Sequence, residues 1–276
     1  NGVTACWLSA APVSGRLRRN RLLSRRGGPA LANGGNEPIL RVRLPRRRRR
    51  VALLLACVLL SLLSAQSGRS PSPVDLILVL ALDVSSSVDK DEFDLQKLGL
   101  AAAFRHPLVA KAIARGRAKR IVVATVQWAG YRQQQIMLPW TVIGNGDEAA
   151  SYADKLAAMP RAFPGGATHL AGIIDFGATL ALSTPFSAMR RVVDISGDGT
   201  DNISGPPHRA RDDAVRAGVT INGLAIANEV PELTRYYRDA VIGGPGAFVL
   251  TARTYDDYPD AILRKLVREI ETRLII

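Results

Sequence analysis

The sequence predicts an α/β fold: a doubly wound, mostly parallel six-stranded sheet with an antiparallel edge strand and helices on both faces. First, short β-branched runs alternate with longer segments of helical period from residue 74 onward. Second, several of these runs are apolar on both faces, as in strands that helices cover on both sides. Third, the chain of 276 residues is 47% hydrophobic and 22% charged, a composition typical of globular domains.

Six segments have the composition of strands. They are residues 74–83, 120–129, 134–140, 190–196, 219–226 and 246–252. Only a few residues, including Gly130, join the second segment to the third, which is too short for a crossover between parallel strands. We therefore expect these two strands to form an antiparallel hairpin, with the third as the antiparallel edge strand.

Six further segments have helical periodicity. They are residues 89–105, 147–159, 169–182, 207–217, 232–241 and 257–273. Asp89 and Glu92 stand at capping-box spacing at the start of the first. Pro259 falls in the first turn of the last, where proline is tolerated. One domain spanning 74–276 would contain all of these elements.

The positive charge of the chain is concentrated before this domain. Residues 1–67 hold 13 arginines, no lysine and one acidic residue, Glu37, which accounts for +12 of the formal charge of +13. Residues 68–276 carry 24 basic and 23 acidic residues, so they lack the basic surface that phosphate contacts require. The sequence therefore predicts no nucleic-acid partner.

The basic N-terminal extension ends in the pattern of a signal peptide. LPRRRRR at 44–50 precedes an apolar core at 51–63, and small and polar residues follow. A membrane-spanning helix needs roughly 20 apolar residues, which is more than this core provides. We expect cleavage after Ser67, a linker at 68–73, no membrane span after cleavage, and a periplasmic or secreted domain.

Both cysteines, Cys6 and Cys57, lie in this leader. Cleavage after Ser67 would leave a mature chain without cysteine, which excludes disulfides, thiol catalysis and cysteine metal sites. Lipid attachment at Cys57 and an uncleaved membrane anchor are the alternatives. The first methionine is Met137, so we expect that the given start lies upstream of the true one, or that the true start uses a non-standard codon such as one at Val42.

Oxygen-bearing side chains lie in three loops: DVSSS (83–87) and SGDGTDN (196–202), which each follow an expected strand, and GGATHL (165–170), which leads into the expected helix at 169–182. The carboxyl ends of parallel strands meet at one edge of a sheet, so these loops should converge. They offer the hard oxygen donors Asp83, Ser85, Ser87, Thr168 and Asp198. Hard oxygens with only two acids suit Mg²⁺. Because Asp and Ser are also common turn and capping residues, plain structural turns are the simplest alternative.

The same residues resemble the metal-ion-dependent adhesion site (MIDAS) of von Willebrand factor A-type (vWA) domains. The resemblance rests on D-x-S-x-S at 83–87, Thr168, and Asp198 before Gly199. The order of strands and helices over 74–273 is similar to that Rossmann-type fold as well. Phrases such as ISGDG (195–199) resemble an uncharacterised bacterial family of exported proteins within the superfamily.

The resemblance implies a role for each oxygen. Ser85 and Ser87 would bind Mg²⁺ (or Mn²⁺) directly, Thr168 directly or through water, and Asp83 and Asp198 largely through water. An ion with few charged ligands stays electrophilic, and its open position can take a carboxylate from a protein partner. The implied function is that of an exported interaction module, not an enzyme.

Two departures from the family pattern concern the site. Ser86 stands where the family commonly has glycine. ISGDG has one more residue between strand and aspartate than the common form, which leaves Asp194 as an alternative to Asp198. A residue inside a strand should not reach the loop edge, so the sequence favours Asp198.

Hydrolase functions are the alternatives from another class. GDGTDN with Asp83 upstream resembles haloacid dehalogenase-like phosphatases, but Ser85 occupies the position of their general acid, and serine cannot serve as one at neutral pH. GGATHLAG resembles the histidine motif of subtilisin-like proteases, but Gly166 replaces the base. His169 could line a ligand site, although a lone histidine at a helix start is usually a solvated or capping residue. A structural domain with a vestigial metal site is the third alternative.

Overall fold

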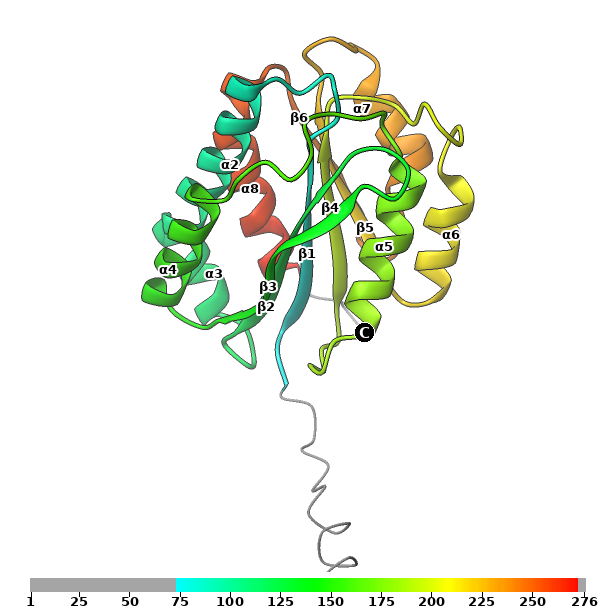
Figure 1. Ribbon diagram of the computed structural model, residues 1–276. Helices are drawn as coiled ribbons and strands as arrows, with labels where there is room; N and C mark the ends of the chain where they lie inside the picture. Colours follow the sequence, from blue (N-terminus) through cyan, green and yellow to red (C-terminus); the bar gives the residue numbers. More distant parts are fainter. Residues whose placement is uncertain (1–72, 273–276) are drawn as a thin grey trace, which may run out of the picture. The chain divides into compact units, whose positions relative to one another are not determined.

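Residues 73–272 are described by a computed structural model of the chain (Figure 1). The expected N-terminal extension, the signal core at 51–63, both cysteines and the cleavage point after Ser67 lie outside these residues and stay predictions. Within 73–272 no helix has the length and apolar character that crossing a membrane requires.

The described residues form one six-stranded sheet in the order β3-β2-β1-β4-β5-β6. The strands are β1 (Leu76–Asp83), β2 (Ile121–Trp128), β3 (Gln134–Ile143), β4 (Arg191–Gly197), β5 (Thr220–Ile226) and β6 (Val249–Ala252). The edge strand β3 is antiparallel to β2, and all other neighbours are parallel. The predicted fold class, including the hairpin and the antiparallel edge strand, is confirmed.

Helices cover both faces of this sheet. They are α2 (Lys90–Arg105), α3 (Pro107–Ala114), α4 (Gly146–Ala157), α5 (Leu170–Leu182), α6 (His208–Arg216), α7 (Leu233–Tyr236), the π-helical turn η1 (Tyr237–Val241), the 3₁₀ turn η2 (Tyr255–Asp257) and α8 (Tyr258–Glu271). Figure 1 shows α2, α3, α4 and α8 on one face and α5, α6 and α7 on the other. The capping box expected at α2 is present, with Asp89 and Glu92 exchanging two hydrogen bonds of 2.9 and 2.8 Å.

One helix was not predicted from the sequence. The structure turns residues PLVAKAIA into α3, which begins at Pro107 immediately after α2 ends. A residue that precedes proline disfavours helical backbone, so α2 stops and His106 becomes a cap for the new helix. Its side-chain Nδ1 accepts a hydrogen bond of 3.2 Å from the backbone N–H of Leu108. The proline therefore separates two helices rather than ending one.

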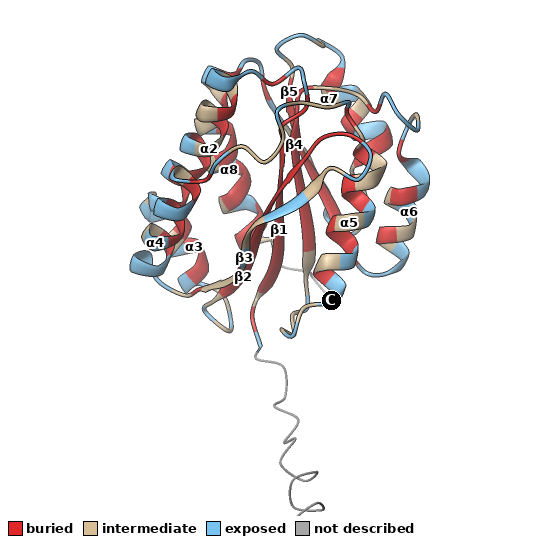
Figure 2. Cartoon of the chain, viewed as in Figure 1, coloured by how far each residue is buried: buried red, intermediate tan, exposed pale blue. Residues whose placement is uncertain are grey.

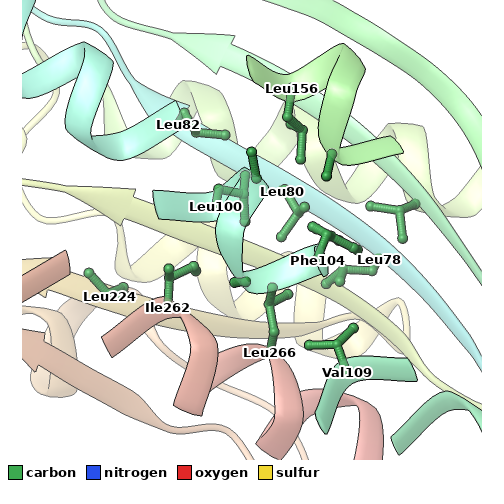
Figure 3. Close-up of a cluster of buried hydrophobic side chains, with 14 of the residues drawn as sticks. Leu78, Leu80, Leu82, Leu100, Phe104, Val109, Leu156, Leu224, Ile262 and Leu266 are labelled. Carbon is green, nitrogen blue, oxygen red and sulfur yellow. The ribbon is translucent and has the colours of Figure 1, made fainter. Parts of the chain in front are cut away.

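Strand β1 lies at the centre of the hydrophobic core. Every residue of β1 is buried (Figure 2). Successive side chains of a strand point to opposite faces of the sheet. Leu78, Leu80 and Leu82 pack toward α2, α4 and α8, as the close-up in Figure 3 shows. Ile77 and Val79 belong to the second cluster, which packs against α5 and α6. This double packing fixes the end of β1, where the first of the three loops begins.

Candidate metal centre

Asp83 is the last residue of β1 and is fully buried. The loop after it turns at once: its Oδ1 accepts a hydrogen bond of 2.8 Å from the backbone N–H of Ser85. Val88 N–H then donates to the Ser85 carbonyl at 3.1 Å, just before α2 begins. The D-x-S-x-S segment is therefore a tight turn that holds its side chains at the C-terminal end of the sheet.

This turn meets the loop that follows β4. The Ser87 hydroxyl donates to Asp198 Oδ1 at 2.7 Å, and the hydroxyls of Ser85 and Ser87 lie 3.2 Å apart. Tyr255, from η2, donates its hydroxyl proton to Asp198 Oδ2 at 2.9 Å. The structure thus brings Ser85, Ser87 and Asp198 into one connected group of oxygen atoms, although 111 residues separate Ser87 from Asp198.

Thr168 lies beside this group at the start of α5. Asn202 and Thr168 exchange two hydrogen bonds: Thr168 N–H donates to Asn202 Oδ1 at 2.9 Å, and Asn202 N–H donates to the Thr168 carbonyl at 3.0 Å. A methyl group added at Gly199 would lie 3.2 Å from the Thr168 hydroxyl. The second loop therefore places the Thr168 hydroxyl against Gly199, the residue that follows Asp198 in the third loop.

One buried oxygen of this group has no partner within the described residues. It is Oδ2 of Asp83, which lies against the end of β4, where a methyl group on Gly197 would approach it to 2.8 Å. Burial, and then the nearby negative charge of Asp198, raise the pKa of Asp83 to about 7. Two buried carboxylates this close favour a cation between them, and the hydroxyls of Ser85, Ser87 and Thr168 add hard oxygens that fit one.

The composition of the set is consistent with an oxygen-liganded ion. Among residues 73–272 no group of three or more His, Cys, Asp or Glu side chains could hold a metal. The five oxygen-bearing residues are instead two acids and three hydroxyls. It is the kind of site in which Mg²⁺ keeps several of its waters.

The raised pKa of Asp83 predicts how pH changes stability in the absence of metal. Between its ordinary pKa of 3.8 and about 7, the folded chain binds a proton at Asp83 that the unfolded chain has released, so stability falls as pH rises through this window. Between about pH 5 and 7.5 we expect Asp83 to account for a loss of about 2–3 kcal/mol. Urea unfolding in chelator at both pH values should show a smaller loss for Asp83→Asn. Equal losses in the two proteins would contradict the assignment.

Ser86 faces away from this oxygen group. Its N–H donates to the Gly166 carbonyl at 2.9 Å, and its hydroxyl accepts from Gly166 N–H at 2.9 Å. The residue that departs from the family pattern therefore fastens the first loop to the second with two hydrogen bonds.

Arg161 is a residue of the site that sequence reasoning missed. Its guanidinium donates to the carbonyls of Val84 and Ser85 at 2.9 and 3.0 Å, and to that of Asp89 at 3.2 Å. Charge-assisted bonds of this kind are among the stronger ones in proteins. Arg161 thereby holds the backbone of the D-x-S-x-S turn, yet nothing local in its sequence marks this role.

Asp201 organises the third loop in a similar way. Its carboxylate accepts hydrogen bonds from the backbone N–H groups of Ile203 and Ser204 at 3.0 and 2.7 Å, and from that of Ala171 in α5 at 3.0 Å. The sequence signal for this turn was Asp201 followed by Asn202, just after GDG, since Asp and Asn side chains hold turns by such bonds. Asp201 and Asn202 therefore join the loop after β4 to the helix that carries Thr168.

The alternative ligand Asp194 lies elsewhere. It sits inside β4, and its Oδ1 is 2.5 Å from Nζ of Lys265 in α8. The same ammonium group lies 2.6 Å from Oε1 of Glu269. The structure places Asp194 in this buried charge cluster rather than with the five oxygen-bearing residues, as its mid-strand position suggested.

Comparison with known sequences places most of the chain in one family. Residues 73–274 match the profile of a family described as a protein of unknown function (DUF1194). No curated protein sequence matches the chain.

Several solved structures share the fold. Proximal thread matrix protein 1 from the mussel byssus, with a zinc-occupied MIDAS motif, has a TM-score of 0.52 at 16% identity, over 73% of this chain and 49% of that chain. A von Willebrand factor type A protein from Catenulispora acidiphila has a TM-score of 0.51 at 16% identity, covering 71% and 43%. The pilus adhesin SpaC from Lactobacillus rhamnosus GG has a TM-score of 0.53 at 13% identity, covering 74% and 31%. The chain spans less than half of each of these proteins, and such identities indicate a shared fold alone.

Proposed function

The chain belongs to the DUF1194 family and has the fold of a von Willebrand factor A domain, and on this premise we propose that it is an exported protein-interaction module. Its Mg²⁺ (or Mn²⁺) site would capture a carboxylate of a partner protein. The observation that carries the proposal is the convergence of three loops on one group of oxygens, of which Asp83 Oδ2 is buried and has no partner within the described residues.

Each side chain has a distinct role in this proposal. The hydroxyls of Ser85 and Ser87 would bind the ion directly, Thr168 directly or through water, and Asp83 and Asp198 largely through water. When bound, the ion supplies an electrophilic position for the partner carboxylate. Tyr255 holds Oδ2 of Asp198 by its 2.9 Å hydrogen bond, which fixes the direction of the other carboxylate oxygen toward Ser87.

Binding is a better fit to these contacts than hydrolysis. Within residues 73–272, no histidine or lysine side chain is hydrogen-bonded to Asp83 or Asp198, so no conventional base accompanies the acids. The pilus adhesin and the byssus matrix protein that share the fold support an interaction role at a cell surface or in a matrix. The zinc-occupied MIDAS of the byssus protein supports a divalent cation in a site of this kind.

The export signal at 44–63 adds to this proposal a location outside the cytoplasm, in the periplasm or in secreted form. A partner there would present its carboxylate from a protein surface. A metal- or aspartate-dependent hydrolase and a structural domain with a vestigial site are the competing functions.

A minimal carboxylate probe tests the proposal directly. We expect a capped Gly-Asp-Gly peptide to perturb the NMR spectrum of the chain only when Mg²⁺ is present, with a dissociation constant in the millimolar range, roughly 4 kcal/mol of binding free energy. The capped Gly-Asn-Gly peptide is the matched control and should cause no perturbation, because it lacks the carboxylate. Perturbation by both peptides, or by neither, would contradict carboxylate capture at the metal.

A screen of phosphate esters and carboxylate esters separates the hydrolase alternative. Metal-dependent turnover that disappears in Asp83→Asn would favour the enzyme over the binding module.

A further inference from the structure

We infer that Arg132 forms a second anchoring point for an acidic partner, beside the metal, so that the domain selects segments that carry two carboxylates. This inference rests on the proposed function, since the first carboxylate is the one captured at the metal. It concerns the loop between β2 and β3, which closes the antiparallel hairpin at the edge of the sheet.

Three side chains lead from the metal site to this loop, and we call them the Tyr131 ledge: His169, Tyr131 and Arg132. His169 follows the proposed ligand Thr168 directly in the chain. The rings of His169 and Tyr131 lie with their centroids 6.0 Å apart, and the Arg132 guanidinium carbon lies 5.3 Å from the centroid of the Tyr131 ring. Tyr131 is 65% exposed and Arg132 is exposed as well, so the ledge presents an aromatic and a cationic surface next to the ion.

The loop that carries the ledge is held in place by hydrogen bonds. Ala129 N–H donates to the Gln133 carbonyl, and Gly130 N–H donates to Gln133 Oε1, each at 2.9 Å. Gln133 Nε2 donates to the Gly165 carbonyl at 3.2 Å, and His169 N–H donates to the Ala129 carbonyl at 3.1 Å. The last two bonds tie the loop to the segment that carries Thr168. The ledge is therefore preorganised relative to the metal site, and little ordering is needed when a partner binds.

Arg132 has an unusual backbone for its residue type. Its φ of +57° lies in the left-handed region, which glycine and asparagine occupy more readily than arginine. Within residues 73–272 its guanidinium forms no ion pair and no hydrogen bond, and it lies over the Tyr131 ring. A strained backbone that presents an unpaired cation beside a candidate binding site is the kind of feature that binding sites retain.

The charges around the candidate metal site differ between its two sides, and this difference favours one side for a second carboxylate. Glu229 follows β5, which lies on the other side of β1 from the β2–β3 hairpin, and Glu92 of α2 accepts a hydrogen bond of 3.4 Å from Asn228, the neighbour of Glu229. Burial raises the pKa of Glu92, and the negative charges of Asp89, Asp198 and Glu229 raise it further. A second partner carboxylate would be repelled on that side and attracted by Arg132 on the other.

The chemistry of the ledge matches an acidic segment. A guanidinium presents parallel N–H donors that bind a carboxylate in a bidentate manner. Arginine and tyrosine are also enriched among residues that dominate protein interfaces. The partner inferred here is therefore a protein segment with one carboxylate for the metal and a second for Arg132.

Peptides with one and two carboxylates test this inference on the Mg²⁺-loaded chain. The probes are the capped Gly-Asp-Gly peptide and capped peptides with two aspartates separated by one to four glycines. By NMR titration, we expect the best two-carboxylate peptide to bind the wild-type chain about 2- to 5-fold more tightly, as an exposed ion pair allows. Arg132→Asn should abolish this gain while leaving the affinity for Gly-Asp-Gly unchanged, because asparagine keeps the left-handed backbone and removes the charge.

Arg264→Gln is the matched control, since Arg264 is an exposed arginine of α8, and it should keep the gain. A gain that survives in Arg132→Asn, or no gain in the wild-type chain, would overturn the inference while leaving Mg²⁺-dependent binding of Gly-Asp-Gly intact. If the wild-type chain with Mg²⁺ does not bind Gly-Asp-Gly, that result would instead reject the proposed function, and the inference with it.

Discussion

Asp83→Ala is expected to lower the affinity of the chain for Mg²⁺ by about 10- to 100-fold, measured by calorimetry, because residues that hold the water shell of an ion change its affinity by this much even without touching it. Asp83 contributes the buried oxygen that has no other partner within the described residues, and its negative charge would attract Mg²⁺ to the candidate site. Ser85→Ala should reduce the affinity as well, since it removes a proposed direct ligand.

The matched control is Asp147→Ala. Asp147 is an exposed aspartate in the first turn of α4, which follows β3 at the opposite end of the sheet. The Asp147→Ala substitution should leave the affinity for Mg²⁺ unchanged. If the wild-type chain binds no Mg²⁺, or if Asp83→Ala and Ser85→Ala bind it as the wild type does, the three loops form structural turns and the metal site is vestigial.

Lys265→Met is expected to destabilise the fold by about 3–5 kcal/mol, because it leaves two buried carboxyl groups without their cation. Lys265 and Glu269 are fully buried, and the ammonium group lies 2.5 Å from Asp194 Oδ1 and 2.6 Å from Glu269 Oε1. Burial, and then the charge of Glu269, raise the pKa of Asp194 above its ordinary value. Methionine has a similar length, so the packing volume is largely kept and the lost charge dominates the effect.

Urea unfolding measures this change. Arg264→Met, at an exposed position of the same helix, should change the free energy of unfolding by less than about 0.5 kcal/mol. The triple variant Asp194→Leu, Lys265→Met and Glu269→Leu should recover most of the stability, because an apolar cluster can replace a buried ionic one. A loss below about 1 kcal/mol in Lys265→Met would show that the buried cluster does little to hold α8 against β4.

The fold was predictable from the sequence because its signals are local. Apolar runs marked the strands, and the short link around Gly130 specified the antiparallel hairpin. The end of β6 was placed correctly, but its start was placed three residues too early, at 246 instead of Val249. Helix α3 was not predicted, although Pro107 stands in its first turn, where proline is favoured.

The candidate site was predictable in part for the same reason. Asp83, Thr168 and Asp198 each stand where a strand gives way to a loop or a helix begins, which a sequence displays directly. Arg161 acts on a turn 76 residues away, so no spacing rule connects it to Ser85. Likewise, the contact of Lys265 with Asp194 exists only because α8 packs on β4, which depends on the whole fold. Local sequence patterns therefore could not identify residues that are far apart in the chain and meet only in the fold.

The direction of β1 has a mechanical consequence. The described chain enters at Pro73, at the end of the sheet opposite Asp83, and its last described residue, Thr272, follows α8 toward the same end (Figure 1). A force applied between the chain at Pro73 and a partner bound near Asp83 would therefore act along β1. The hydrogen-bond ladders that join β1 to β2 and β4 would resist this force in shear, all at once, rather than opening one bond at a time. A partner captured at the proposed metal site would therefore be held against tension by these two ladders.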